Sequence, residues 1–354
     1  MGDPPEMDDD VEVNPPELRA AVLPEQLGPW LDAQVPEFGT LRTVDRISGG
    51  HSNLTFRLTS ARGTVVALRR PPMGKVQPTA NDVLRESRVM RALVTTAVPV
   101  PRVLADCSDL GVIGVPFFLM DFVEGHVLRD RQAAQILPAA ARRNAGFRLI
   151  DILAELHAVQ PAGVGLADLG APDGYLERQL RRWFDQYERT RVRPRPVLEQ
   201  VHDTLRRAAP SAVGTSIVHG DYRLDNTIVD DDGRIRAVLD WEICTLGDPL
   251  ADVGLLCAYW PEPGEKSLVV STTTAEGFPS RAEIVARYAE RSGHDLSGIA
   301  YYVAFGWWKL ACIAEGVLAR YTAGGLGVEA NLQRMDHLVD QLADRANDCV
   351  QELG

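Results

Sequence analysis

In the segment HGDYRLDN, Asp221 and Asn226 have side chains with hard oxygen atoms and lie five positions apart. Another carboxylate, Asp240, follows in the triplet DWE at the end of the apolar run RIRAVLDW. Carboxylate and amide oxygens are ligands that Mg²⁺ prefers, and a carboxylate can also orient a hydroxyl and accept its proton. These residue types are the set that transfer of a γ-phosphoryl group to a hydroxyl requires.

The spacing matches the kinase catalytic loop, in which an Asp lies at the acceptor hydroxyl and an Asn and a later Asp bind metal. The match predicts Asp221 as the catalytic residue and Asn226 and Asp240 as metal ligands, with His219 bracing the loop. Alternatively, HGDYRLDN is a polar turn in which Gly, Asp and Asn are favoured for backbone reasons. The DWE triplet argues against that alternative, because its carboxylate would lie beside the loop.

Two β-like runs, IV and RIRAVLDW, surround the polar loop and a DDG turn. Upstream, from Leu41, short β-like runs alternate with turns, and NDVLRESRVMRAL has the periodicity of an amphipathic helix. After the apolar strand VIGVPFFLMDFV, helical periodicity dominates. This order predicts an α+β fold with a small β-rich lobe and a larger, mainly helical lobe.

HGDYRLDN together with VLDWEICTLGDPLADVG resembles the aminoglycoside phosphotransferase family, over about Leu41 to Leu342. The later part resembles the branch associated with acyl-CoA dehydrogenases. The resemblance implies a bilobal protein-kinase-like fold, ATP and Mg²⁺ as cofactors, and phosphorylation of a small-molecule hydroxyl. The domains we expect are a flexible acidic and Pro-rich tail (1–16), a nucleotide-binding N-lobe (17–122) and a helical C-lobe with the catalytic loop and substrate site (123–354).

The resemblance assigns the small residues of one N-lobe loop to the phosphates, since such residues let backbone N–H groups approach an anion. They are Ser48, Gly49, Gly50, Ser52 and Asn53. The alternative for this loop is a plain hairpin turn.

Arg69, in VALR, takes the position at which kinases have a Lys that contacts the α- and β-phosphates. Arginine keeps the charge but replaces a point charge with a planar fork. Strand alternation places Ala67 and Arg69 on one face and Arg70, the alternative, on the other. Glu86 is the predicted acidic partner of Arg69; otherwise it is a solvated residue on an exposed helix face.

Met120, Asp121 and Val123 occupy the expected connection between the lobes, where backbone groups of Asp121 and Val123 would pair with adenine. The run FFLM also suits a buried strand, and both interpretations can hold.

Downstream of DWE, Asp248 is a good N-cap with Pro249 at the first helical position. We expect structural roles for Asp248 and Asp252. The short GDPLADVG continuation, without an APE motif, disfavours a phosphorylation-switched protein kinase. Lys309 and Glu315 are weaker candidates for the substrate site.

Composition excludes several other classes. The chain has 354 residues and a formal charge of −12, which argues against nucleic acid and anionic membranes as partners. Its five cysteines form no CxxC pair, which is typical of free thiols in a reducing compartment. The N-terminus has acidic residues and prolines where a secretory signal needs basic and apolar ones, so we expect a cytoplasmic location.

Two function classes remain. The first is an enzyme that phosphorylates a small hydroxyl compound with MgATP, with an aminoglycoside-like compound, a hydroxy-acyl metabolite or another metabolite as acceptor. The second is a nucleotide-binding pseudokinase that acts as a sensor or interaction partner. Arg69 at the Lys position favours the second class, whereas Asp221, Asn226 and Asp240 favour the first.

Overall fold

The computed structural model describes residues 11–47, 53–73, 82–262, 264–324 and 332–353. The chain divides into two units, here called unit 1 (1–95 and 100–124) and unit 2 (96–99 and 125–354). Unit 1 is rich in strands and unit 2 is mainly helical, as an α+β fold requires.

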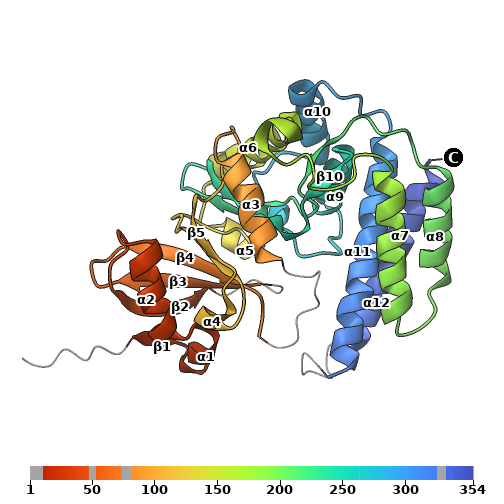
Figure 1. The fold of residues 1–354 in the computed structure, drawn as a ribbon. Helices are drawn as coiled ribbons and strands as arrows, with labels where there is room; N and C mark the ends of the chain where they lie inside the picture. Colours follow the sequence, from red (N-terminus) through yellow and green to blue (C-terminus); the bar gives the residue numbers. More distant parts are fainter. Residues whose placement is uncertain (1–10, 48–52, 74–81, 263, 325–331, 354) are drawn as a thin grey trace, which may run out of the picture. The chain divides into compact units, whose positions relative to one another are not determined.

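A six-stranded sheet in the order β1-β2-β3-β4-β6-β5 forms the base of unit 1 (Figure 1). β1 runs parallel to β2, and the other neighbours are antiparallel. The strands are β1 (Glu12–Asn14), β2 (Leu41–Ile47), β3 (Leu54–Ser60), β4 (Val65–Arg70), β5 (Val103–Cys107) and β6 (Phe117–Asp121).

Helices complete unit 1: α1 (Arg19–Val22), α2 (Pro24–Gln34), α3 (Val83–Leu93) and α4 (Leu110–Ile113). The inward residues of alternating strand positions, such as Phe56 and Leu58 of β3, share a core with Leu27 and Leu31 of α2. α3 begins at a cap in which the Asp82 side chain accepts from the Arg85 N–H.

The predicted tail over residues 1–16 is too long. Residues 12–14 form β1, whose Val13 is opposite Val44 in the sheet and is only 6% exposed. Backbone pairing along the sheet edge and burial of Val13 order a segment whose acidic and Pro-rich composition suggested otherwise.

Unit 2 contains the helices α5 (Arg131–Ala134), α6 (Ala139–Ala158), α7 (Tyr175–Thr190), α8 (Pro196–Arg207), α9 (Leu250–Ala258), α10 (Arg281–Ser292), α11 (Ile299–Thr322) and α12 (Leu332–Gln351). Two small antiparallel pairs carry the polar segments. One joins β7 (Ser216–Val218) to β10 (Thr245–Gly247), and the other joins β8 (Thr227–Val229) to β9 (Ile235–Val238).

α11 is the central helix of unit 2 (Figure 1). It is long and apolar enough to cross a membrane, but 78% of its apolar window is buried inside the protein, as in a core helix. Its backbone touches that of α9: a Cβ added at Gly254 would lie 2.3 Å from the Tyr302 carbonyl carbon. Glycine at position 254 therefore sets how closely α9 and α11 approach.

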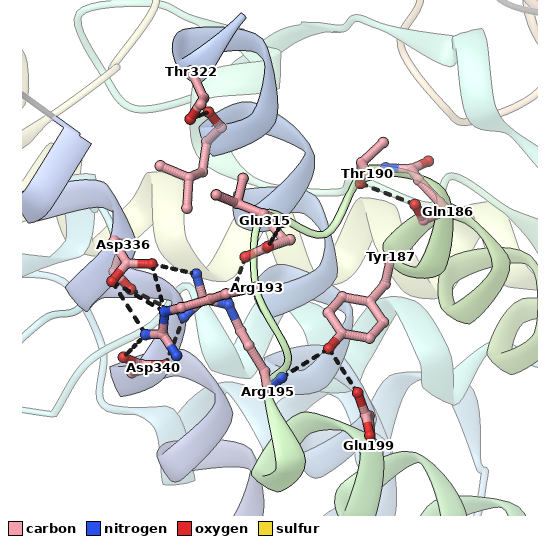
Figure 2. Close-up of polar contacts among 12 residues, drawn as sticks. Gln186, Tyr187, Thr190, Arg193, Arg195, Glu199, Glu315, Thr322, Asp336 and Asp340 are labelled. Atoms are coloured by element: carbon pink, nitrogen blue, oxygen red, sulfur yellow. Dashed lines mark hydrogen bonds and ion pairs between the residues drawn. The ribbon is translucent and has the colours of Figure 1, made fainter. Parts of the chain in front are cut away.

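A charged cluster ties the α7–α8 connection to α11 and α12 (Figure 2). Arg195 Nε donates to Glu315 Oε2 at 2.6 Å, and both side chains are at most 1% exposed. Arg195 also donates to Asp336 Oδ1 at 2.7 Å and to Asp340 Oδ1 at 2.6 Å, and Arg193 pairs with the same two aspartates. Glu315, predicted as a weak substrate-site candidate, is committed to this cluster instead.

Replacing Glu315 with Gln is expected to lower the free energy of unfolding by about 1–3 kcal/mol, because Arg195 would lose its fully buried carboxylate partner and keep only the partly exposed Asp336 and Asp340. Denaturant unfolding followed by circular dichroism measures the loss. The matched control is Glu188→Gln, which breaks the exposed Arg191–Glu188 pair and should leave stability unchanged. Equal stabilities for the two variants would contradict the assignment of Glu315 as the buried counter-ion.

Candidate active site

The β8–β9 hairpin brings Asn226 and Asp240 together. Its register pairs Thr227 with Val238, so Asn226 just before β8 lies beside Leu239 just after β9. The Leu239 N–H donates to the Asn226 carbonyl at 2.8 Å, and Asp240 comes next. Asn226 and Asp240, which are 14 residues apart in the sequence, thus lie close together at the open end of one hairpin.

Asp240 has a left-handed backbone conformation, with φ of +68°. Such a conformation is uncommon outside glycine, although Asp tolerates it better than most residues. The next residue, Trp241, is fully buried, and its Nε1–H donates to the Val238 carbonyl at 3.1 Å. This anchor fixes the turn in which the Asp240 carboxylate is presented.

His219 links the catalytic loop to the hairpin. Its Nε2 is 2.9 Å from the Leu239 carbonyl oxygen, and its Nδ1 is 3.3 Å from the Asp221 backbone nitrogen. Because a carbonyl oxygen can only accept, Nε2 of His219 must carry a proton and donate to Leu239. The other ring nitrogen, Nδ1, then accepts from the Asp221 N–H. The fully buried imidazole therefore braces the backbone at Asp221 against the residue that precedes Asp240.

Asp252, on α9, accepts two hydrogen bonds from the loop backbone. Its Oδ2 accepts from His219 N–H at 2.7 Å and its Oδ1 accepts from Gly220 N–H at 2.8 Å. Burial opposes ionisation of Asp252, but the bond from His157 and those from the loop hold its pKa below the ordinary value. Asp248 has a different structural role, because it accepts from Leu250 N–H at 3.1 Å and from the Tyr302 hydroxyl at 2.6 Å.

The Asp221 carboxylate is held by neighbours in its own loop. Asn226 Nδ2 donates to Asp221 Oδ2 at 3.0 Å and to the Asp221 carbonyl at 2.8 Å. Arg223 Nε lies 3.3 Å from Asp221 Oδ1, and its guanidinium also pairs with Asp225 at 3.0 Å and covers the Tyr259 ring at 4.5 Å. The contact of Arg223 with Asp221 was not predicted from the sequence. The signal that could have indicated it was a cation two positions after Asp221.

Arg223 and Asp225 form a partly buried ion pair, with side chains 26% and 23% exposed. Burial raises the pKa of Asp225 to about 6, against the opposing effect of Arg223. Burial also disfavours the Arg223 charge, but Asp221, Tyr259 and Asp225 raise the pKa of Arg223 above its ordinary value. Arg223 thus stays charged among acidic side chains.

The donor set suits Mg²⁺. With its amide nitrogen bound to Asp221, Asn226 offers its amide oxygen as a ligand atom, and Asp240 follows Leu239, the backbone neighbour of Asn226. Among residues that the structure describes, no group of three or more His, Cys, Asp or Glu side chains could hold a metal by itself. Two oxygen ligands completed by water and phosphate oxygens are typical of Mg²⁺ and not of a closed zinc site.

In unit 1, Arg69 Nε donates to Glu86 Oε2 at 2.7 Å, and Arg69 also donates to the Thr55 hydroxyl at 3.3 Å. Glu86 is 1% exposed, so the alternative of a solvated residue on an exposed helix face is wrong. Arg70 turns to the other face, where it bonds the carbonyls of Pro71 and Ala21. Strand alternation therefore separates the two arginines.

Of the other N-lobe candidates, some lie in the part of the chain that the structure describes and some do not. Ala67 and Met120 are paired across β4 and β6, and Val123 is half-buried after β6. The Asp121 N–H already donates to the Arg102 carbonyl at 2.9 Å, so adenine would have to use the Asp121 carbonyl and the Val123 N–H. Asn53 is 2% exposed at the start of β3, whereas Ser48, Gly49, Gly50 and Ser52 lie outside the described residues.

The family model described as "Phosphotransferase enzyme family" matches residues 43–290. The chain is 33% identical over 306 residues to acyl-CoA dehydrogenase family member 11 of Rattus norvegicus, which covers 83% of this chain and 39% of that protein. The chain thus spans about two fifths of the length of this curated relative.

Solved structures show the same fold. A Ralstonia eutropha protein, whose assignment as an aminoglycoside phosphotransferase is provisional, superposes with a TM-score of 0.78 at 33% identity over 93% of this chain and 98% of its own. A thermostable aminoglycoside phosphotransferase mutant, in complex with ADP and hygromycin B, superposes with a TM-score of 0.58 at 16% identity over 93% and 99% of the two chains. These matches confirm the predicted bilobal protein-kinase-like fold. The chain therefore belongs to the phosphotransferase enzyme family.

Proposed function

We propose that this protein transfers the γ-phosphoryl group of MgATP to a hydroxyl of a hydroxy-acyl metabolite. The observation that carries the proposal is the arrangement of Asp221, Asn226 and Asp240 on one braced loop and hairpin of unit 2. Positioning and electrostatic stabilisation supply most of the catalysis of phosphoryl transfer, so a rigid set of oxygen ligands is the feature that matters.

In this proposal Asp221 orients the acceptor hydroxyl and accepts its proton. Asn226 and Asp240 hold Mg²⁺, which when bound neutralises charge on the phosphates. Asn226 has a second task, because its amide nitrogen holds the Asp221 carboxylate at 3.0 Å. One side chain thus couples the position of the base to that of the metal.

Arg69 is the proposed cation for the α- and β-phosphates. Its ion pair with the buried Glu86, at 2.7 Å, sets the direction of the guanidinium. The same geometry is expected of the Lys–Glu pair of kinases, so arginine at this position is compatible with nucleotide binding. Backbone groups of the Ser48–Asn53 loop and of Asp121 and Val123 complete the proposed nucleotide contacts.

A small cavity adjoins the catalytic loop and is the proposed place for part of the acceptor. It has a volume of about 20 Å³, room for one small group, and is lined by Arg223, Tyr259, Trp260, Ser271 and Thr273 among others. Aromatic walls and hydroxyl groups suit a compact acceptor with both apolar and polar parts.

The acyl character of the acceptor is supported by the relatives. Proteins named as acyl-CoA dehydrogenases are 32–33% identical to this chain over most of its length. Structures with bound aminoglycosides are far less similar, at 16% identity for the hygromycin B complex, and support the fold alone. We therefore prefer a hydroxy-acyl acceptor to an aminoglycoside.

An acceptor screen tests the proposed function directly. Hydroxy acids, their coenzyme A thioesters, aminoglycosides and other small alcohols are incubated with MgATP, and ADP release and a product mass increase of one phosphoryl group are measured. We expect transfer to a hydroxy-acyl compound. Binding of MgATP without transfer to any acceptor would instead support the pseudokinase alternative, and transfer to aminoglycosides alone would contradict the acyl assignment.

Asp221→Asn is expected to lower kcat about 10²–10⁴-fold, because the amide cannot accept the hydroxyl proton, while MgATP affinity is retained. Steady-state kinetics and calorimetric titration of MgATP give the two quantities. Asp231→Asn is the matched control, since Asp231 is an exposed carboxylate on the same hairpin that pairs with His126. A kcat for Asp221→Asn equal to that of the control would remove Asp221 from the catalytic role.

Asp240→Asn is expected to raise the Mg²⁺ concentration needed for half-maximal ATP binding by about tenfold or more, because a charged ligand is lost. Asparagine is chosen because it tolerates the left-handed backbone at this position. Titration of ATP binding against Mg²⁺ measures the change, with Asp232→Asn as the hairpin control. Unchanged Mg²⁺ dependence would show that Asp240 is not a metal ligand.

A further inference from the structure

Lys309 is a buried cation on α11 that contacts the catalytic loop from a distant part of the sequence. Its Nζ donates to the Gly220 carbonyl at 2.7 Å across a separation of 89 residues, and the residue is 6% exposed. The Nζ also lies 5.2 Å from the centre of the Trp183 ring on α7. Lysine is almost never this buried without a partner, so the carbonyl and the aromatic face are its substitutes for water.

Burial is costly for this group. It lowers the pKa of Lys309, with Asp221 and Asp252 acting in the opposite direction. A methionine would fill a similar volume without that desolvation cost. The cation therefore has to be explained by what it does at Gly220.

The peptide that joins Gly220 to Asp221 is fixed at both of its polar atoms. Lys309 holds the carbonyl oxygen at 2.7 Å, and His219 Nδ1 accepts from the Asp221 N–H at 3.3 Å. The preceding Gly220 N–H is held by Asp252. Gly220 itself has φ of +87°, and an added Cβ would lie 3.0 Å from the Ile243 side chain, so the chain turns sharply at the point where Lys309 binds.

We propose that Lys309 is a positioning residue for phosphoryl transfer, which sets the orientation of the Gly220–Asp221 peptide and through it the Asp221 carboxylate. The inference rests on the proposed role of Asp221. A hydrogen bond from a charged donor is about twice as strong as one between neutral groups. Such a bond suits Gly220, which has no hydrogen-bonded strand partner to fix its backbone. A displacement of about 1 Å at a reacting group can cost about 100-fold in rate.

The test compares Lys309→Met, which removes the donor, and Lys309→Arg, which keeps charge and donors, with the control Tyr301→Phe. Tyr301 lies on the same helix, and its hydroxyl donates to the Leu205 carbonyl of α8 at 3.0 Å. Removing this hydroxyl deletes a side-chain hydrogen bond from α11 to a backbone carbonyl outside the loop. For each variant we measure kcat, the Kd of MgATP, the thermal unfolding midpoint and amide hydrogen exchange of the 216–226 segment.

Lys309→Met is expected to lower kcat about 10–100-fold and to speed exchange in the 216–226 segment, with the Kd of MgATP within about twofold of the parent value. Tyr301→Phe should change neither kcat nor loop exchange. Lys309→Arg should lie closer to the parent in both quantities. The kcat and the loop exchange must change together in whichever Lys309 variant folds.

A folded variant that slows transfer without loosening the loop, or loosens it without slowing transfer, overturns the inference. Equal losses in Lys309→Met and Tyr301→Phe also overturn it, because they would indicate a general weakening of α11. If the parent enzyme itself transfers no phosphoryl group, the proposed function fails. The exchange comparison then still decides whether Lys309 anchors the loop.

Discussion

The two hydrogen bonds from the loop backbone to Asp252 are the interaction on which the active site depends. Between β7 and the hairpin the chain leaves regular structure, so the N–H groups of His219 and Gly220 have no strand partners. A buried N–H without an acceptor costs about 1–3 kcal/mol. One carboxylate with two oxygens satisfies both groups, at 2.7 and 2.8 Å, and so makes an irregular loop conformation the stable one.

The helix that carries Asp252, α9, lies directly against α11. The glycines at 254 and 306 allow the backbones of these helices to touch, since a Cβ at Gly306 would lie 3.1 Å from the Gly254 carbonyl. α9 then brings Asp252 to one side of the Gly220 backbone, and α11 brings Lys309 to the other. Small residues thus set how closely the two helices that hold the loop approach each other.

Spacing along the chain was sufficient to predict the α+β fold and that Asp221, Asn226 and Asp240 lie close together, because these features depend on local residue order. The catalytic and metal-binding roles of these residues stay predictions. Partners brought together by tertiary packing were not predictable in the same way. Glu86 could not be distinguished from an exposed helical glutamate until its burial was known, and Lys309 meets the loop across 89 residues. The predicted tail extended too far along the chain, because β1 is ordered by pairing with β2 and composition does not reveal such pairing.

The charges near the loop explain why a cation belongs there. Asp221, Asp225 and Asp240 all raise the pKa of Arg223, so acidic side chains gather around this guanidinium. Lys309 is committed to the Gly220 carbonyl, and its burial limits the charge that it can contribute. Carboxylates that repel one another in a partly buried site favour a divalent cation, which has no side-chain entropy to lose and can bind phosphate oxygens at the same time. Under the proposed function, the acidic side chains around the loop would favour a nucleotide that arrives with its metal.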